Sequence, residues 1–80
     1  MNFQEIADII LFHRKKAELS RNELADLAGV GKTVVFDIEH GKATVQYQSL
    51  AKVLETLNIK MTLQSLLMTE YQQSQNSTPL

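Results

Sequence analysis

Apolar residues recur at helical spacing along the first part of this chain. In residues 3–18, apolar positions three and four residues apart predict an amphipathic helix. Its expected core-facing stripe consists of Phe3, Ile6, Ile10, His13 and Ala17. Three more apolar residues lie off that stripe, at Ile9, Leu11 and Phe12. We therefore expect this helix to present a second apolar face to another surface.

Two short helices follow in the pattern. Ser20 is a favoured N-cap residue, and Glu23 three positions later completes a capping box, so a helix is predicted over residues 21–28. Gly29 ends that helix, as glycine commonly does just after a helix C-terminus. The apolar spacing predicts another helix over residues 32–40.

A further helical stripe precedes a change of period. The stripe consists of Leu50, Val53, Leu54 and Leu57, and Asn58 closes the predicted helix. Residues 59–64 then alternate apolar and polar side chains, which indicates a half-buried strand. A helix is the competing interpretation, because a helical face is also shared by Ile59, Leu63, Leu66 and Leu67. We expect residues 71–80 to be a disordered polar tail, since they have almost nothing to bury.

The composition narrows the class of protein. With 80 residues the chain is near the lower limit for a domain that stabilises its own core, and we assign that domain to residues 3–70. The absence of cysteine excludes disulfides and thiolate metal sites, and two histidines are too few for a zinc site, so we expect no metal and no cofactor. Without a leader-like segment or an apolar run of about 20 residues, we expect a cytoplasmic protein that does not enter a membrane.

Gly29-Val30-Gly31 separates the two short predicted helices. A short glycine-containing connection of this kind is typical of the helix-turn-helix, whose second helix can enter the major groove of DNA. The same spacing also occurs in plain helical bundles, so spacing alone leaves both interpretations open. A net charge of −1 means that any contact with DNA must depend on local positive charge.

The residues themselves resemble a known family. Residues 19–30, with the sequence LSRNELADLAGV, resemble the L-[ST]-Q-x-E-L-A-x-x-x-G-V core of phage-repressor-like (Cro or XRE) helix-turn-helix proteins. Residues 35–42 resemble the I-S-x-[IW]-E-N-G-K segment of that family, and residues 50–59 resemble its following helix. Residues 41–45 and 53–63 look like the HipB-like antitoxin branch, in which a short strand follows the fourth helix and pairs with its copy in a second subunit.

The resemblance implies that the second short helix reads DNA. The residues expected to face bases are Lys32, Thr33, Val34, Phe36 and Asp37. Arg21 and Lys42 are expected to contact phosphates, and the family pattern implies that Arg14 pairs with Glu39 and so ties the first helix to the recognition helix. Two assignments keep an alternative, since Val34 could instead pack locally and Lys42 could instead complement the end of the preceding helix.

The chain departs from the family pattern at several of these positions. Arg21 stands where glutamine is usual, and an arginine can still reach a phosphate. Phe36 replaces a small polar residue and Asp37 a basic or amide residue, so a thymine methyl and a cytosine amino group become possible contacts, although a carboxylate also repels phosphates. His13 occupies a position that is usually apolar, and we expect it to be a core or interface residue rather than a ligand.

A lone strand implies a second copy of the chain. A strand cannot satisfy its own backbone donors and acceptors, and the sequence offers no second strand. The residues expected to pair with the same segment of a two-fold-related copy are Ile59, Lys60, Met61, Thr62, Leu63 and Gln64. The predicted fold class is therefore all-α, a compact lambda-repressor-like helical bundle with a helix-turn-helix, plus a short C-terminal strand that joins a homodimer.

Together these features predict a homodimeric transcriptional repressor that binds a palindromic operator in double-stranded DNA. As the resemblance implies, it would be the antitoxin of a toxin–antitoxin operon, which it represses while restraining a HipA-like kinase toxin. The alternative is a protein-binding module with little DNA affinity, whose working surface is the polar tail with Ile9, Leu11 and Phe12. An enzyme has no support, because Ser20 is explained as a helix cap and no oxyanion loop accompanies it.

Overall fold

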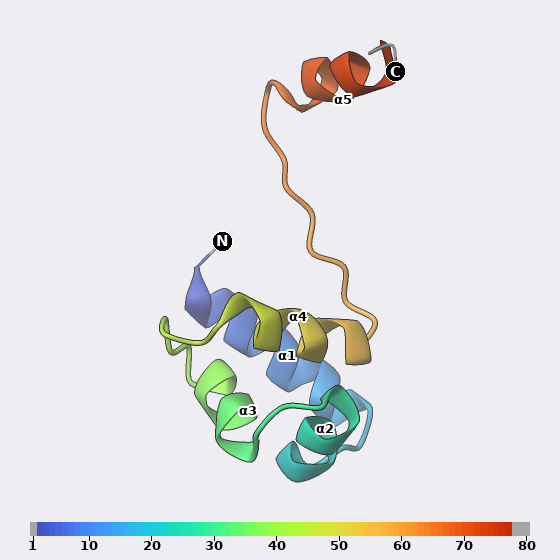
Figure 1. Ribbon diagram of the computed structural model, residues 1–80. Helices are drawn as coiled ribbons and strands as arrows, with labels where there is room; N and C mark the ends of the chain where they lie inside the picture. Colours follow the sequence, from blue (N-terminus) through green and yellow to red (C-terminus); the bar gives the residue numbers. More distant parts are fainter. Residues whose placement is uncertain (1, 78–80) are drawn as a thin grey trace.

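The computed structural model describes residues 2–77, which form five helices. The helices are α1 (Phe3–Lys16), α2 (Arg21–Ala28), α3 (Lys32–Glu39), α4 (Tyr47–Thr56) and α5 (Met68–Ser77). The first four pack into one bundle, and α5 stands apart from it at the end of an extended segment (Figure 1). No helix among residues 2–77 has the length and apolarity needed to cross a membrane.

α1 begins at a side-chain cap and buries a different stripe from the expected one. The Asn2 side chain accepts a hydrogen bond from the Glu5 backbone N–H at 2.8 Å. The residues that α1 buries are Ala7, Ile10 and Arg14. The expected stripe holds at Ile10 and at Ile6, which is partly buried and packs against the core. It is wrong at the other three positions, Phe3, His13 and Ala17, which are exposed; His13 Nδ1 lies 2.6 Å from the Ile9 carbonyl oxygen. The buried face includes Arg14 because its guanidinium finds polar partners inside the bundle.

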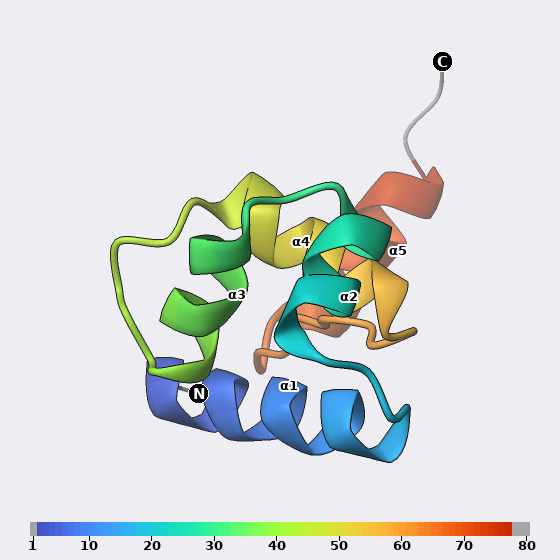
Figure 2. The same cartoon turned by 90° about the horizontal axis from the view of Figure 1, so that it is seen from below.

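The hydrophobic core lies where α1, α2, α3 and α4 meet (Figure 2). Its buried residues are Ile10, Leu24, Ala25, Val35, Ile38, Val53 and Leu54. Burying a Val, Leu or Ile side chain stabilises a fold by about 1.5–3 kcal/mol, so even this small core contributes substantially to folding. Because α3 packs against α1, α2 and α4, its inner face is fixed and its outer face is left to solvent.

The two short helices of the predicted helix-turn-helix are α2 and α3, and their boundaries agree closely with the sequence prediction. Ser20 Oγ accepts from the Glu23 N–H at 3.0 Å, and Glu23 Oε1 accepts from the Ser20 N–H at 2.9 Å, which completes the capping box. Gly29 ends α2 in the left-handed conformation, with φ 72° and ψ 36°. α3 starts after Gly31, which provides no side-chain cap.

The predicted strand at residues 59–64 does not form in the single chain. Ile59 packs against the core, and its N–H donates to the Leu54 carbonyl at 2.9 Å. Residues 60–65 then run away from the bundle as an extended segment with no regular secondary structure (Figure 1). The physical reason is that no second strand exists among the described residues, so there is no ladder for this segment to join. The competing helix over 59–67 does not form either.

The chain becomes helical again in α5, which corrects the expectation of a disordered tail from residue 71 onward. Residues 71–77 belong to α5, and the rest of that expected tail, residues 78–80, lies outside the described residues. The glutamines of this stretch are good helix formers, and Glu70 in the first turn complements the helix dipole. Side chains of residues 69–75 are exposed, so α5 adds nothing to the core of the bundle.

Gly29 and Gly31 flank the same turn, yet one substitution should affect them in opposite ways. A side chain at Gly29 would meet no atom within 4 Å, so Gly29→Ser costs only the left-handed backbone penalty of about 1–2 kcal/mol. Gly31 has φ −70°, which any residue adopts, and Gly31→Ser adds a cap to α3 that should stabilise the fold by about a few tenths of a kcal/mol. Thermal denaturation should show a lower melting temperature than the parent for Gly29→Ser and a slightly higher one for Gly31→Ser. Equal melting temperatures for the two variants would contradict this account of the turn.

Candidate nucleic-acid interface

The outward side of α3 carries a continuous stripe of polar and aromatic residues. With the residue that follows the helix, the stripe consists of Lys32, Thr33, Phe36, Asp37 and His40. At about 100° per residue these positions fall within one arc of the helix. Val35 and Ile38 lie on the opposite side and are buried in the core. The packing of α3 therefore turns four of the five residues expected to face bases toward solvent.

Val34, the fifth of those residues, is half-buried and packs against the core. This contact supports the local-packing alternative for Val34, whereas a base contact stays a prediction. Val34 and Asp37 also line an open hollow with Thr44, Gln46 and Ser49. The last three were not expected at the site, because no local pattern marks them and only the fold brings the start of α4 beside α3.

A second open hollow lies in front of the helix-turn-helix, between α2 and the start of α3. It is lined by Arg14, Ser20, Arg21, Asn22, Lys32, Thr33 and Phe36. Three of these side chains are basic and none is acidic. The Glu39 carboxylate that pairs with Arg14 and Arg21 neutralises one of the three charges, so net positive charge remains here although the whole chain has a net charge of −1. Sequence reasoning did not place Ser20 and Asn22 at the site, because the capping box already explained Ser20. Such a surface suits a polyanion.

The carboxylate of Glu39 joins α3 to the two preceding helices. Arg14 Nε donates to Glu39 Oε2 at 2.6 Å, Arg14 Nη2 donates to Glu39 Oε1 at 3.1 Å, and Arg14 Nη1 donates to the Leu19 carbonyl at 2.8 Å. Arg21 Nε donates to Glu39 Oε1 at 2.9 Å. The side chains of Glu39 and Arg14 are only 1% and 10% exposed, so this is a buried, fully hydrogen-bonded ion pair.

The same contacts determine the ionisation of Glu39. Burial by itself raises the pKa of Glu39, but the hydrogen bonds and positive charges of Arg14 and Arg21 outweigh it, and the pKa lies below its ordinary value. A lowered pKa in the folded state means that the fold stabilises the charged carboxylate. Glu39 therefore contributes stability above its unfolded pKa of about 4.3, and that stability is lost as pH falls through the folded-state pKa.

Arg21 connects this buried network to the outer surface. Its side chain is 44% exposed, and its guanidinium lies over the Phe36 ring at 5.4 Å. The Phe36 ring in turn stacks on the His40 imidazole, with centroids 3.9 Å apart. Nη1 and Nη2 of Arg21 have no hydrogen-bond partner among residues 2–77 and are free for a phosphate. Sequence reasoning missed the bond to Glu39; the available signal was a cation in a first helical turn, which the helix dipole does not favour.

Lys42 lies beside Asp37 at the end of α3. Its Nζ is 3.8 Å from Asp37 Oδ2, and its backbone N–H donates to the Asp37 carbonyl at 3.0 Å. An exposed pair of this kind contributes little stability. It does offset the negative charge of Asp37, which would otherwise repel a phosphate backbone. The alternative in which Lys42 complements the end of the preceding helix therefore has structural support.

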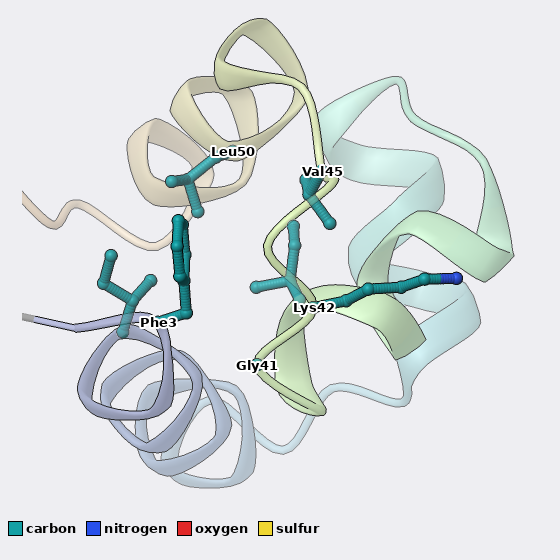
Figure 3. Close-up of a pocket in the computed structure, with 7 residues that line it drawn as sticks. Phe3, Gly41, Lys42, Val45 and Leu50 are labelled. Carbon is teal, nitrogen blue, oxygen red and sulfur yellow. The ribbon is translucent and has the colours of Figure 1, made fainter.

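Figure 3 shows the Lys42 side chain pointing away from a small cavity beneath it. Phe3, Val45 and Leu50 contribute the labelled apolar side chains that line this cavity. Its volume is about 20 Å³, which holds no more than about one water molecule. Among the described residues there is also no cluster of His, Asp or Glu that could bind a metal. The surface of α3, rather than a cavity, is therefore the candidate functional site.

The Glu39 network makes a prediction about stability. Glu39→Ala leaves Arg14 buried without a counter-charge and should lower the free energy of unfolding at pH 7 by about 3–5 kcal/mol. The difference from the parent should shrink as pH falls through the lowered folded-state pKa of Glu39, because the parent's carboxylate then becomes protonated. Glu55→Ala, at an exposed position of α4, is the matched control and should change stability by less than about 0.5 kcal/mol. Denaturant unfolding across pH measures both effects, and a pH-independent difference would refute the role of the Glu39 charge.

Comparison with known proteins identifies the family. Residues 13–64 match the family model described as Helix-turn-helix. The uncharacterized HTH-type transcriptional regulator y4mF of Sinorhizobium fredii is 40% identical over 53 residues, which span 66% of this chain and 70% of that protein. Two solved structures, a chain described as MDT Protein and HipB in a complex with an O2 20mer, share the fold with a TM-score of 0.74. Each is 20% identical and covers 82% of this chain, with 93% and 92% of their own lengths matched. This chain belongs to the helix-turn-helix family of transcriptional regulators.

Proposed function

We propose that the chain is a homodimeric transcriptional repressor that binds DNA through α3. The observation that carries this proposal is the basic hollow in front of the helix-turn-helix, which adjoins the outward stripe of α3. A protein with a net charge of −1 has no general attraction for a polyanion. The local positive charge of exposed Lys32 and partly exposed Arg21 at this hollow is therefore the feature that favours DNA.

The proposed contacts divide into two groups. Bases in the major groove are read by Lys32, Thr33, Val34, Phe36 and Asp37, and phosphates are bound by Arg21 and Lys42. The N-terminus of α3 has no side-chain cap, so the backbone N–H groups of Lys32 and Thr33 and the positive end of the helix dipole are available to a phosphate. Phe36, held between Arg21 and His40, presents an apolar edge suited to a thymine methyl.

The proposed dimer forms through residues 59–64. Apart from the Ile59 N–H, which donates to the Leu54 carbonyl, their backbone is unpaired in the single chain, and an antiparallel pair with a second copy satisfies it on one edge. A two-fold axis relates the two copies of α3, so the proposed operator is palindromic, with half-sites about 34 Å apart.

We extend the proposal to an antitoxin that represses its own operon in the cytoplasm and restrains a HipA-like kinase toxin. The support is the sequence resemblance of residues 41–45 and 53–63 to the HipB-like branch and the shared fold with HipB from the O2 20mer complex. Co-purification of the chain with the product of the adjacent gene tests the antitoxin role. If that product has no kinase fold and does not bind the chain, the antitoxin role is refuted.

DNA binding makes a prediction about salt dependence. On a mixed-sequence duplex, which lacks the operator bases, we expect the Lys32 charge to neutralise a phosphate instead. Lys32→Ala should therefore weaken binding to such a labelled duplex and reduce the slope of log K against log salt by about 0.9. Lys52→Ala is the matched control, because it removes the same charge from an exposed position of α4 outside the basic hollow. Fluorescence anisotropy at several salt concentrations measures both slopes, and equal slopes for the two variants would take Lys32 out of the interface.

One observation favours a second candidate function, a protein-binding module that uses the outer face of α1. Phe12 and Ile9 are exposed there, and Lys16 lies over the Phe12 ring at 5.6 Å. The salt titration separates the two functions, because a module without DNA affinity would bind no duplex at low salt.

A further inference from the structure

The segment that leaves the bundle after Ile59 carries its apolar residues on one face. Ile59 packs on the core, Met61 is 40% exposed and Leu63 is 82% exposed. All three have odd numbers, and in an extended chain alternate residues point to the same side. No backbone hydrogen bond joins residues 60–64 to the rest of the described chain. The segment therefore presents both an apolar face and a free backbone edge.

An apolar hollow lies at the root of this segment, between α1 and α4. Its volume is about 90 Å³, and it is lined by Ile6, Ile9, Leu54, Ile59, Lys60 and Met61. Five of these six side chains are apolar, so the hollow suits an aliphatic side chain. Leu63 of the same chain cannot fill it while the segment extends outward, because Leu63 lies beyond the bundle and remains exposed.

The parity of the apolar residues restricts how two such segments pair. In an antiparallel pair related by a two-fold axis, the numbers of opposite residues add to a constant, and opposite side chains share a face. An odd constant would place apolar residues opposite polar ones. An even sum places Ile59, Met61 and Leu63 of one copy opposite odd-numbered residues of the other copy. The two-fold axis then passes between one residue and the same residue of the second copy.

The possible positions of the two-fold axis differ in the charged and apolar residues that they place opposite each other. An axis at Lys60 would place two lysines opposite each other, which is unfavourable. An axis at Thr62 would place Ile59 opposite Ser65. An axis at Met61 places Met61 opposite its copy and Ile59 opposite Leu63, so every apolar residue has an apolar partner.

We infer that the dimer pairs residues 59–63 in this register, centred on Met61, and that Leu63 of each copy covers the hollow of the other. This inference rests on the homodimer in the proposed function and specifies its interface. A second copy of the chain is the partner that fits this hollow, because its own segment offers both a free backbone edge that can pair with residues 59–63 and, in this register, a leucine beside the hollow. The radius of gyration of 15.6 Å, against about 12 Å for a compact chain of this length, agrees with an arm that extends away from its own bundle.

The absence of cysteine from the chain allows a direct test of the register. In the inferred pair the two Met61 Cα atoms lie about 4.5–5.5 Å apart, within disulfide range. The two Thr62 Cα atoms lie about 8 Å apart, beyond that range. Under mild oxidation Met61→Cys should form a disulfide-linked dimer at least about tenfold faster than Thr62→Cys. Non-reducing electrophoresis of the full chain measures both rates, and faster cross-linking of Thr62→Cys would overturn the register.

Leucine substitutions test whether Leu63 covers the apolar hollow of the second copy. Leu63→Ala should raise the dimer dissociation constant by about tenfold or more, because two leucines leave apolar surroundings in each dimer. Leu66→Ala is the matched control: Leu66 is even more exposed, at 102%, yet lies outside the paired residues. Sedimentation equilibrium measures both constants, and circular dichroism verifies that the helices persist. An equal effect of the two substitutions on the dissociation constant would refute the inference that Leu63 covers the hollow of the second copy.

The outcomes separate this inference from the proposed function. A parent chain that is dimeric and binds duplex DNA while Met61→Cys does not cross-link would retain the proposed function and overturn the register. A parent chain that is monomeric at every accessible concentration would overturn both the register and the homodimer. A monomeric parent chain that still binds duplex DNA, with a smaller salt slope in Lys32→Ala than in the parent, would retain the DNA-binding part of the proposed function without the dimer.

Discussion

The orientation of α3 depends on one buried carboxylate. Glu39 lies at the C-terminal end of α3, and its two oxygens accept hydrogen bonds from Arg14 of α1 and Arg21 of α2. Apolar packing alone would hold α3 against the core but would permit small rotations, since dispersion contacts have little directionality. The bidentate pair with Arg14 has a fixed geometry, so it defines the rotation of α3 about its own axis. The Arg14–Glu39 pair therefore also determines the direction in which the outward stripe of α3 faces.

The parts of the fold that local chemistry specifies could be predicted from the sequence. The capping box of Ser20 and Glu23 marks the start of α2, and Gly29 marks its end, because both signals act within a few residues. The buried stripe of α1 could not be predicted in this way. Periodicity favours His13 as an apolar-like core residue and treats Arg14 as a surface charge, whereas the partner that makes Arg14 tolerable inside lies 25 residues away in the sequence.

The candidate site shows the same division. The stripe on α3 follows from helical periodicity, and Lys32, Thr33 and Phe36 could be placed on it from sequence alone. The double role of Arg21, which bonds Glu39 and stacks on Phe36, depends on the crossing of α2 and α3 and has no local signature. Residues 59–64 illustrate a further limit: their alternating pattern is a preference for pairing, and it cannot form a ladder where the described residues offer no second strand.

A dimer that reads two half-sites needs a rigid path from its interface to each recognition helix. Ile59 begins that path, since it packs on the core and its N–H is bonded to the Leu54 carbonyl of α4. Leu54 belongs to the same buried cluster as Val35 and Ile38 of α3, so no flexible linker intervenes between the segment and the recognition helix. In the proposed dimer, the register of the paired segments therefore determines the separation of the two α3 helices. A shift of the axis by one residue would displace each subunit along the pair by about 7 Å relative to the other, a fifth of the helical repeat between half-sites. In the proposed dimer, the register of the paired segments would therefore set the spacing of the half-sites, and Glu39 would set the angle at which each α3 meets its half-site.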